Sequence, residues 1–338
     1  MSAEKKRNYL FDNVKVLLIF FVVTSHFIRV RGNFNPGGID GIYYTIAFSF
    51  IMQGFFFISG YFSKNVMKCH MNAAKNFLLP YFIMTILMYG FRYLLYGHAT
   101  LSFLEPSHAL WFLLVMFMYR FTIPYLAKIP MLLSFSLLAY LFVGCFGIAT
   151  DTLAIGRMIS FFVFFIAGFN ANASHFEKLR SIPKRYTRLL LVFLLGVSCF
   201  LARTELIPVE MWHLSESFAS FGINNTEGVF IRLLLLCLSI LWLIVIFNLV
   251  PDQKLSFSYI GRYTMEIYAF HIPIRYIIKR TGIPMNSSTS ILICFYLAFL
   301  AICFFSSPKA AQLYNEVLDF TSRCISNIKN IVSHRLSA

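Results

Sequence analysis

The chain has 338 residues, of which 59% are hydrophobic and only 13% are charged. A soluble globular domain carries about 25% charged residues, so roughly half of the expected charge is missing. The 40 Phe and 18 Tyr residues exceed what a soluble core needs, whereas helices of about 20 apolar residues that face lipid account for them. The composition therefore excludes a soluble protein. It predicts one membrane domain, because no stretch between the apolar runs is long enough to form a core of its own.

The formal net charge of +15 does not indicate a nucleic-acid-binding protein. The Lys and Arg residues form no patch interleaved with aromatic residues; they punctuate the loops between apolar runs, as in the cytoplasmic loops of membrane proteins. We therefore expect a lipid bilayer with anionic headgroups, and no nucleic acid, as the partner of this charge. The seven Cys residues form no CxxC pair and most lie inside apolar runs, which predicts buried thiols.

The apolar runs predict an all-α protein, a polytopic bundle of about ten transmembrane helices. In chain order the predicted spans cover residues 11–30, 42–62, 77–97, 109–126, 131–148, 157–173, 189–207, 229–250, 263–280 and 289–306. An even number of crossings places both termini on the same side. Lys5, Lys6 and Arg7 precede the first run, but no small-residue cleavage site follows it, so we expect a retained span and not a signal peptide.

The distribution of positive charge sets the orientation of the predicted bundle. With the N-terminus inside, about 18 of the 29 Lys and Arg residues fall in inner segments and about eight at the outer ends. The longest outer segment, residues 206–228, carries three Glu and no Lys or Arg, and is either a solvated loop or a lid or short interfacial helix. We therefore expect both termini in the cytoplasm, a membrane domain over residues 1–306, and a basic cytoplasmic tail over residues 307–338 that forms an amphipathic helix.

The first predicted span carries two ionisable residues on one face. Lys15 and His26 are eleven positions apart, which corresponds to ~16 Å along a helix and a return to within about 20° of the same direction. Ionisable groups inside a span are unfavourable, and by default they face a cavity or a partner. The alternatives are that Lys15 snorkels to the inner headgroups and that His26 is a hydrogen-bonded interfacial histidine.

Six motifs follow one another along the chain and together resemble one family. They are Phe11–Lys15 with His26, Phe55–Phe62, Lys75 to Pro80-Tyr81, Leu110–Leu113, Phe161 to Gly168, and Gly261–Thr264 with Ile267, Tyr268 and His271. In this order they resemble the signature of the acyltransferase-3 family of integral membrane acyltransferases. The opening FDN-x-K is similar to the branch related to sugar O-acetylases. The resemblance runs from about residue 7 to residue 275.

The chain departs from the family pattern at three places. Lys15 stands where relatives commonly have Arg, which keeps the charge but loses the bidentate fork of a guanidinium. The segment Phe50–Gln53 replaces the FHMP of many relatives, so a histidine role there does not apply to this chain. Thr264 stands where relatives often have Ser.

The resemblance implies an enzyme of the bacterial plasma membrane. It implies an O-acyltransferase, most often an O-acetyltransferase, that moves an acetyl group from cytoplasmic acetyl-CoA to a hydroxyl of a cell-surface polysaccharide or its lipid-linked precursor. We expect a capsule or an exopolysaccharide as acceptor, because the chain lacks the extracytoplasmic domain that some wall-modifying and lipopolysaccharide-modifying relatives append. Acetyl-CoA is the expected co-substrate, and no metal is expected because the sequence has no ligand spacing such as HExxH.

The quoted residues take roles in this implied reaction. His26 is the predicted catalytic group, because a sugar hydroxyl needs a base of suitable pKa to remove its proton, or an imidazole that carries the acyl group. His271 and Lys15 are predicted to assist catalysis, and Lys15 also to bind the acyl donor. The other predicted site residues are Lys64, Lys75, Ser59 and Gly60 for the acyl donor, and Trp111 and Arg157 for the acceptor.

Several of these predictions have a structural alternative. Ser59 and Gly60 also fit close helix packing, Trp111 fits an aromatic belt at the membrane interface, and Arg157 fits snorkelling. For the whole chain the alternative function is a transporter or flippase for a polar lipid or glycan, although no internal repeats are visible. The acceptor sugar, its hydroxyl, the acyl group and the oligomeric state, a homo-oligomer included, stay open.

Overall fold

The computed structural model describes residues 8–30, 34–148, 150–281 and 289–336, and all regular elements in these residues are helices. The predicted all-α class is therefore confirmed. The basic residues Lys5, Lys6 and Arg7 lie outside the described residues. The α-helices are α1 (Tyr9–Arg29), α2 (Ile39–Phe48), α3 (Ile51–Tyr61), α4 (Val66–Ala73), α5 (Leu79–Tyr96), α6 (Trp111–Leu126), α7 (Leu132–Phe142), α8 (Ile155–Asn170), α9 (Ala173–Ser181), α10 (Lys184–Thr204), α11 (Asn225–Leu249), α12 (Thr264–Thr281), α13 (Thr289–Phe305) and α14 (Pro308–Leu336).

Short helical turns connect several of these helices. A π-helical turn joins α4 to α5, and 3₁₀ turns lie in the longer connections. They are η1 (Ala74–Leu78, the π turn), η2 (His108–Leu110), η3 (Val143–Cys145), η4 (Thr152–Ala154), η5 (Val209–His213), η6 (Phe218–Phe221) and η7 (Ser258–Arg262).

Each predicted apolar run coincides, within a few residues, with a helix or with two consecutive helices. Six helical segments are long and apolar enough to cross a membrane, or up to seven if the bent pair α13 and α14 is one span. The α6 and α7–η3 segments are apolar but shorter, and α12 contains one Glu, two Arg and one Lys. By length and composition the protein is thus a multi-pass helical bundle with six to seven candidate spans, fewer than the ten predicted.

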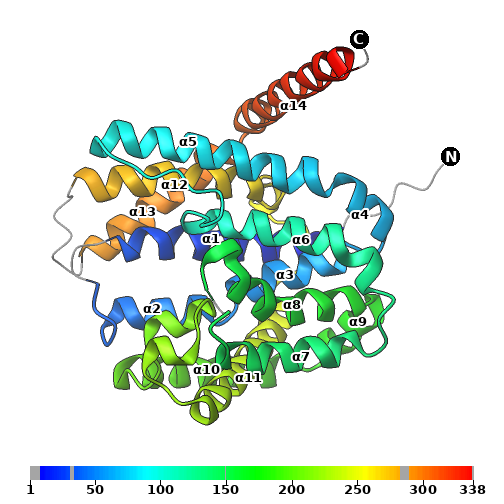
Figure 1. Ribbon diagram of the computed structural model, residues 1–338. Helices are drawn as coiled ribbons and strands as arrows, with labels where there is room; N and C mark the ends of the chain where they lie inside the picture. Colours follow the sequence, from blue (N-terminus) through cyan, green and yellow to red (C-terminus); the bar gives the residue numbers. More distant parts are fainter. Residues whose placement is uncertain (1–7, 31–33, 149, 282–288, 337–338) are drawn as a thin grey trace.

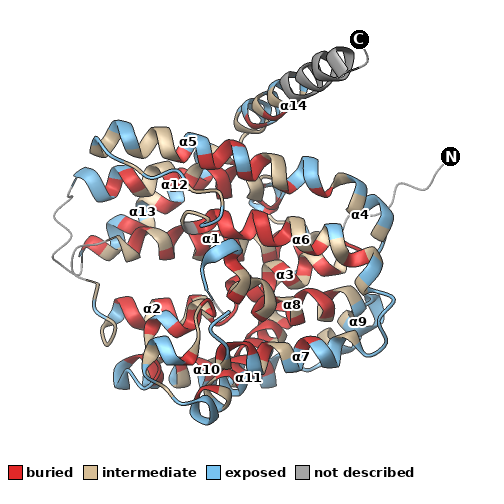
Figure 2. Cartoon of the chain, in the orientation of Figure 1, coloured by how far each residue is buried: buried red, intermediate tan, exposed pale blue. Residues whose placement is uncertain are grey.

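Helix α1 lies inside the bundle (Figure 1). It packs against α2, α3, α12, α13 and η7, and Figure 2 shows buried residues along its length. Its buried residues include the polar Asn13 and Thr24, which form hydrogen bonds with other segments. A helix that other helices surround can bury such polar groups, because its partners supply hydrogen bonds that lipid cannot.

The first turn of α1 is fastened to the segment that precedes α12. The side-chain amide of Asn13 donates to the carbonyl oxygens of Pro251 (2.8 Å) and Gln253 (3.0 Å), and its oxygen accepts from the Ser258 hydroxyl (2.6 Å). Gly261 lies so close that an added Cβ would be 2.5 Å from a backbone oxygen of α1. The first and last sequence motifs therefore meet at the N-terminal end of α1.

Helices α3 and α8 are in backbone contact. A Cβ on Gly60 would lie 1.9 Å from the carbonyl oxygen of Phe165, and one on Gly168 would lie 1.9 Å from that of Phe57. Small residues permit this approach in membrane bundles. Gly60 therefore serves the helix packing that was its structural alternative.

The C-terminal segment is a helix, as expected. Helix α14 follows α13 after a bend of 69° and projects from the bundle (Figure 1). Tyr314 and Leu318 are buried, whereas Leu313 and Phe320 are exposed. The first half of α14 therefore packs on one side only, against α5, α12 and α13.

Replacing Gly60 by Ala should lower the melting temperature of the protein purified in detergent. The added methyl group would overlap the Phe165 carbonyl and push α3 from α8, and overpacking of this kind costs about 1–3 kcal/mol. The matched control is Gly196→Ala on α10, where no heavy atom lies within 4 Å of the added Cβ. Equal melting temperatures of the two variants would contradict a tight contact between α3 and α8.

Candidate active site

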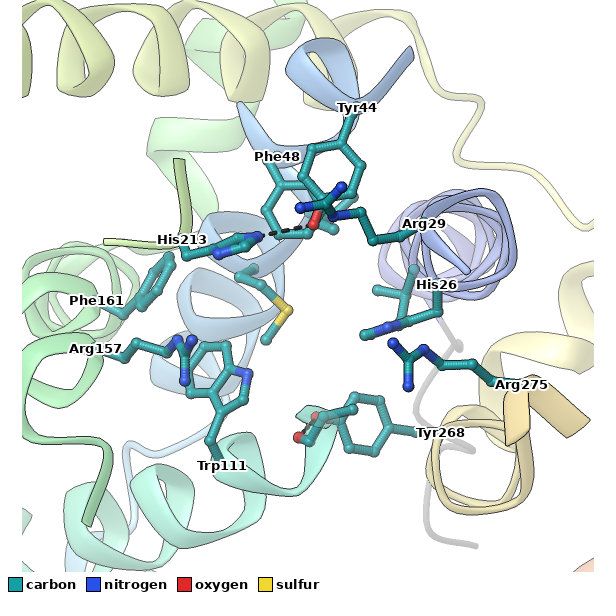
Figure 3. Close-up of a pocket in the computed structure, with 14 residues that line it drawn as sticks. His26, Arg29, Tyr44, Phe48, Trp111, Arg157, Phe161, His213, Tyr268 and Arg275 are labelled. Carbon is teal, nitrogen blue, oxygen red and sulfur yellow. Dashed lines mark hydrogen bonds between the residues drawn. The ribbon is translucent and has the colours of Figure 1, made fainter. Parts of the chain in front are cut away.

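A cavity of about 250 Å³, here called the distal cavity, lies beside the C-terminal half of α1 (Figure 3). Helix α1 contributes His26 and Arg29 to its lining, α8 contributes Arg157, and α12 contributes Tyr268 and Arg275. In Figure 3 the labelled side chains surround a common space. Polar groups from helices far apart in the sequence therefore converge on one site.

The rings of His26 and His271 pack against each other, with 5.1 Å between their centroids. His271 is fully buried, and its Nδ1 lies 3.2 Å from the carbonyl oxygen of Ile267. Because a carbonyl only accepts hydrogen bonds, Nδ1 carries the proton and Nε2 keeps its lone pair. That Nε2 is buried and has no hydrogen-bond partner among the described residues. The fold thus brings together the two predicted catalytic histidines, with His26 at the cavity and His271 behind it.

The two residues predicted to bind the acceptor also line the distal cavity. Trp111 is 9% exposed and stacks on Phe161, with 5.4 Å between the ring centroids. The Arg157 guanidinium lies 5.1 Å from the centroid of the Trp111 ring and pairs with Asp151 at 2.9 Å. Both side chains therefore face the cavity and are held there by contacts within the bundle.

The long segment between α10 and α11 folds onto the bundle and is not a solvated loop. It forms η5 and η6, and its Met211, Trp212 and Phe218 are buried. Its His213 lines the distal cavity, with Nε2 2.8 Å from the hydroxyl of Tyr44. Burial, aided by the charges of nearby arginines, lowers the pKa of His213 from 6.5 to about 3. His213 is therefore a neutral hydrogen-bonding group at neutral pH.

A second cavity of about 210 Å³, here called the proximal cavity, lies nearer the start of α1. Lys15, Ser59 and Arg120 line it, together with mostly apolar side chains. The Lys15 ammonium pairs with Asp12 at 3.1 Å. The Arg120 guanidinium lies 5.1 Å from the Phe77 ring, and its buried Nε has no hydrogen-bond partner among the described residues. The lining of the proximal cavity is therefore mostly apolar and includes two cations.

The two cavities adjoin. Met52 and Tyr268 line both of them. Tyr268 is held in place by a hydrogen bond from its hydroxyl to the carbonyl of Ala109 and lies 5.4 Å from the ring of Phe112. These side chains form the partition between the space around Lys15 and the space around His26.

An open surface cavity of about 800 Å³ lies at the N-terminal end of α1. It shares Lys15 and Phe62 with the proximal cavity and is also lined by Lys64. The Lys64 ammonium donates to the carbonyl oxygens of Ala171 (2.8 Å) and Phe169, at the C-terminal end of α8. Burial lowers the pKa of Lys64. Three cavities thus follow one another from the N-terminal end of α1 to its other end.

Two predicted donor-binding residues line none of these cavities. Lys75 is exposed on the π turn η1 and pairs with Asp319 of α14 at 3.5 Å. Gly60 faces the backbone of α8. Among the described residues no group of three or more His, Cys, Asp and Glu is placed to hold a metal ion.

The pattern of the acyltransferase domain that defines the acyltransferase 3 family matches residues 8–307. The chain belongs to the acyltransferase 3 family. No curated protein and no solved structure shows significant similarity to it. Membership makes this multi-pass protein a membrane acyltransferase and favours that function over the transporter alternative.

Several residues that line these cavities were not identified from the sequence. Arg29 follows His26 by three positions and Arg275 follows His271 by four, and both spacings place residues on one helix face. Their spacing from the two histidines could therefore have identified Arg29 and Arg275 from the sequence. His213 and Tyr44 carry no such signal, because a tertiary contact between η5 and α2 joins them.

Lowering the pH from 7 to 5 should destabilise the wild-type enzyme more than a His213→Gln variant. Above pH 6.5 the histidine is neutral in both states; below it the unfolded chain binds a proton that the folded protein does not bind until about pH 3. The free energy of unfolding therefore decreases as the pH is lowered, and this group contributes at most ~1.4 kcal/mol per pH unit. Melting temperatures of both proteins across this range measure the difference. Parallel curves would contradict the neutral state of His213.

Proposed function

We propose that this acyltransferase is an O-acetyltransferase. It transfers the acetyl group of acetyl-CoA to a hydroxyl of a cell-surface polysaccharide, of the capsule or exopolysaccharide type, or to its lipid-linked precursor. The observation that carries the proposal is the meeting of the proximal and distal cavities at Met52 and Tyr268. A donor that enters past Lys15 and an acceptor in the distal cavity would meet beside His26.

We further propose ten crossings of a bacterial plasma membrane with both termini in the cytoplasm. Helix α1 begins and α14 ends on the same side of the bundle (Figure 1). Basic residues Lys178, Arg180, Lys184 and Arg185 lie on α9 and the start of α10, as the positive-inside rule expects of a cytoplasmic side. The shorter α6, α7 and α13 and the more polar α12 run alongside the six longer segments, which supports counting them as crossings (Figure 1).

The properties of the open surface cavity and of the proximal cavity fit acetyl-CoA as the acyl donor. The open surface cavity carries Lys15 and Lys64, which suit the phosphates of the nucleotide part. The proximal cavity is mostly apolar, which suits the pantetheine arm, and Ser59 supplies a hydroxyl there. The unpartnered Nε of Arg120 is a free donor for an oxygen of the donor molecule.

The proposed reaction is direct transfer with His26 as general base. The His26 imidazole takes the proton of the acceptor hydroxyl, and the oxygen attacks the thioester carbonyl. The C–S bond breaks, CoA leaves as a thiolate, and the proton held by His26 passes to that thiolate. His271 is a positioning residue: fixed by its bond to Ile267, it packs on the His26 ring and sets its orientation.

Replacing His26 by Ala should reduce acetyl transfer by about 10²–10⁴-fold, because a general base contributes that much to a proton transfer. The assay follows label from acetyl-CoA into glycan with purified protein, and proton NMR of the surface polysaccharide follows O-acetyl signals in cells. An unchanged melting temperature shows that the variant is folded. Transfer at the wild-type rate by the folded variant would rule out this role for His26.

Replacing Arg120 by Gln should raise the KM for acetyl-CoA about tenfold and leave kcat nearly unchanged, because a bond from a cation to a phosphate or carbonyl is worth about 1.5–3 kcal/mol. Lys68→Gln, at an exposed cation on α4, is the matched control and should leave KM unchanged. Lys75→Gln tests the sequence prediction in the same assay. A KM for acetyl-CoA that rises for Lys75→Gln and not for Arg120→Gln would place acetyl-CoA at the exposed surface around Lys75. It would contradict entry of acetyl-CoA through the proximal cavity.

A further inference from the structure

Three arginines from three different helices converge on the distal cavity. Arg29 comes from α1, Arg157 from α8 and Arg275 from α12, and Figure 3 shows them around the same space as His26. None of the fourteen described residues that line the cavity is Asp or Glu. The wall that would face an acceptor is therefore cationic.

The carboxylates that pair with two of these arginines lie outside the lining. Arg29 pairs with Glu210 at 3.0 Å, and the Glu210 side chain is 49% exposed. Arg157 pairs at 2.9 Å with Asp151, whose side chain is 59% exposed. Both carboxylates are thus partly exposed and lie outside the cavity lining, whereas their arginines line it.

Arg275 has no carboxylate partner at all among the described residues. Its guanidinium is half-buried and lies 5.9 Å from the ring of Tyr276. Its Nε is buried and makes no hydrogen bond there. A buried donor without a partner is unfavourable, and the other guanidinium groups around the cavity repel it. An anion in the cavity would relieve both penalties.

We infer that the acceptor of the proposed acetyl transfer carries an oxyanion, a carboxylate or a phosphate, on or next to the sugar that is acetylated. The inference rests on the proposed function. A planar guanidinium presents paired N–H groups that match the two oxygens of a carboxylate or phosphate. The remaining lining suits a sugar: Trp111 offers a ring face for stacking, and Tyr44 with His213 offers neutral hydrogen bonds.

The phosphates of acetyl-CoA are not the anion that these arginines serve. The distal cavity meets the proximal cavity only at the shared lining residues Met52 and Tyr268, and the proximal and surface cavities have cations of their own in Lys15, Lys64 and Arg120. The distal arginines lie at the other end of the same path. Their charge therefore belongs to the acceptor.

The test is binding of three probes to the full chain in detergent, followed by tryptophan fluorescence. The probes are a galacturonic acid trimer, a neutral galactose trimer, and a galactose trimer that carries one phosphate monoester. We expect at least one acidic probe to bind ten or more times more tightly than the neutral trimer, and added salt to weaken only acidic binding. The acidic probe that binds more tightly shows whether the acceptor anion is a carboxylate or a phosphate. Loss of the signal in Trp111→Phe assigns it to the distal cavity.

Arg275→Gln should weaken binding of the preferred acidic probe at least tenfold and change binding of the neutral trimer less than twofold. The matched control is Arg280→Gln, five positions along the same helix, where an exposed arginine donates to the Leu95 carbonyl at 3.2 Å. The control should bind all probes as the wild type does. Equal binding of acidic and neutral probes, no binding of any probe, or equal losses for both kinds in Arg275→Gln would overturn the inference.

Acetyl transfer to the same probes separates this inference from the function on which it rests. Transfer from acetyl-CoA to neutral and acidic probes at equal rates would overturn the anionic acceptor and leave the O-acetyltransferase standing. Tight acidic binding without acetyl transfer to any probe would overturn the O-acetyltransferase and leave the anion preference of the cavity standing. Preferential transfer to an acidic probe, lost in Arg275→Gln and kept in Arg280→Gln, supports both.

Discussion

The attachment of the first turn of α1 is the constraint on which the site depends. Asn13 makes three hydrogen bonds to the segment that leads into α12, and Gly261 lets η7 lie against the α1 backbone. A helix is rigid at 1.5 Å per residue, so this one junction sets the level of both Lys15 and His26. It also sets where α12 starts, and therefore where His271 meets His26. The two histidines stay in register because their helices are joined at a common end.

A buried cation performs the corresponding task at the other end of the bundle. Arg232 of α11 donates to the Ser160 hydroxyl (2.5 Å) and to the Tyr140 carbonyl (3.2 Å), and Ser160 in turn donates to the carbonyl of Leu214 (3.1 Å). This chain of bonds connects α11, α8 and α7 to the segment that carries His213. Such a charge is tolerated inside a membrane protein because every bond it makes is to protein. The wall of the distal cavity is therefore held by polar contacts and not by apolar packing alone.

Local patterns predicted the helices and the shared face of Lys15 and His26, because both follow from a helical repeat along one segment. They did not predict that His271 would reach His26, since the packing of α12 on α1 depends on contacts between segments 245 residues apart in the chain, as the bond from Ser258 to Asn13 illustrates. Lys75 lies on a π turn, whose extra residue rotates the following helix relative to an α-helical count. Arg120 escaped notice because it lies within an apolar run, where hydropathy hides a single cation.

One helix that is too polar to count as a candidate span carries several residues of the site. Helix α12 contributes His271, Tyr268 and Arg275, and these polar residues lower its apolar character below that of a typical lipid-facing helix. A helix needs an apolar surface only where it touches lipid. Since α12 packs against α1, α5 and α13, it can present polar groups inward at little penalty. The low hydropathy of α12 thus fits a helix whose polar residues face other helices, whereas α6 and α7 fall short of a candidate span by length alone.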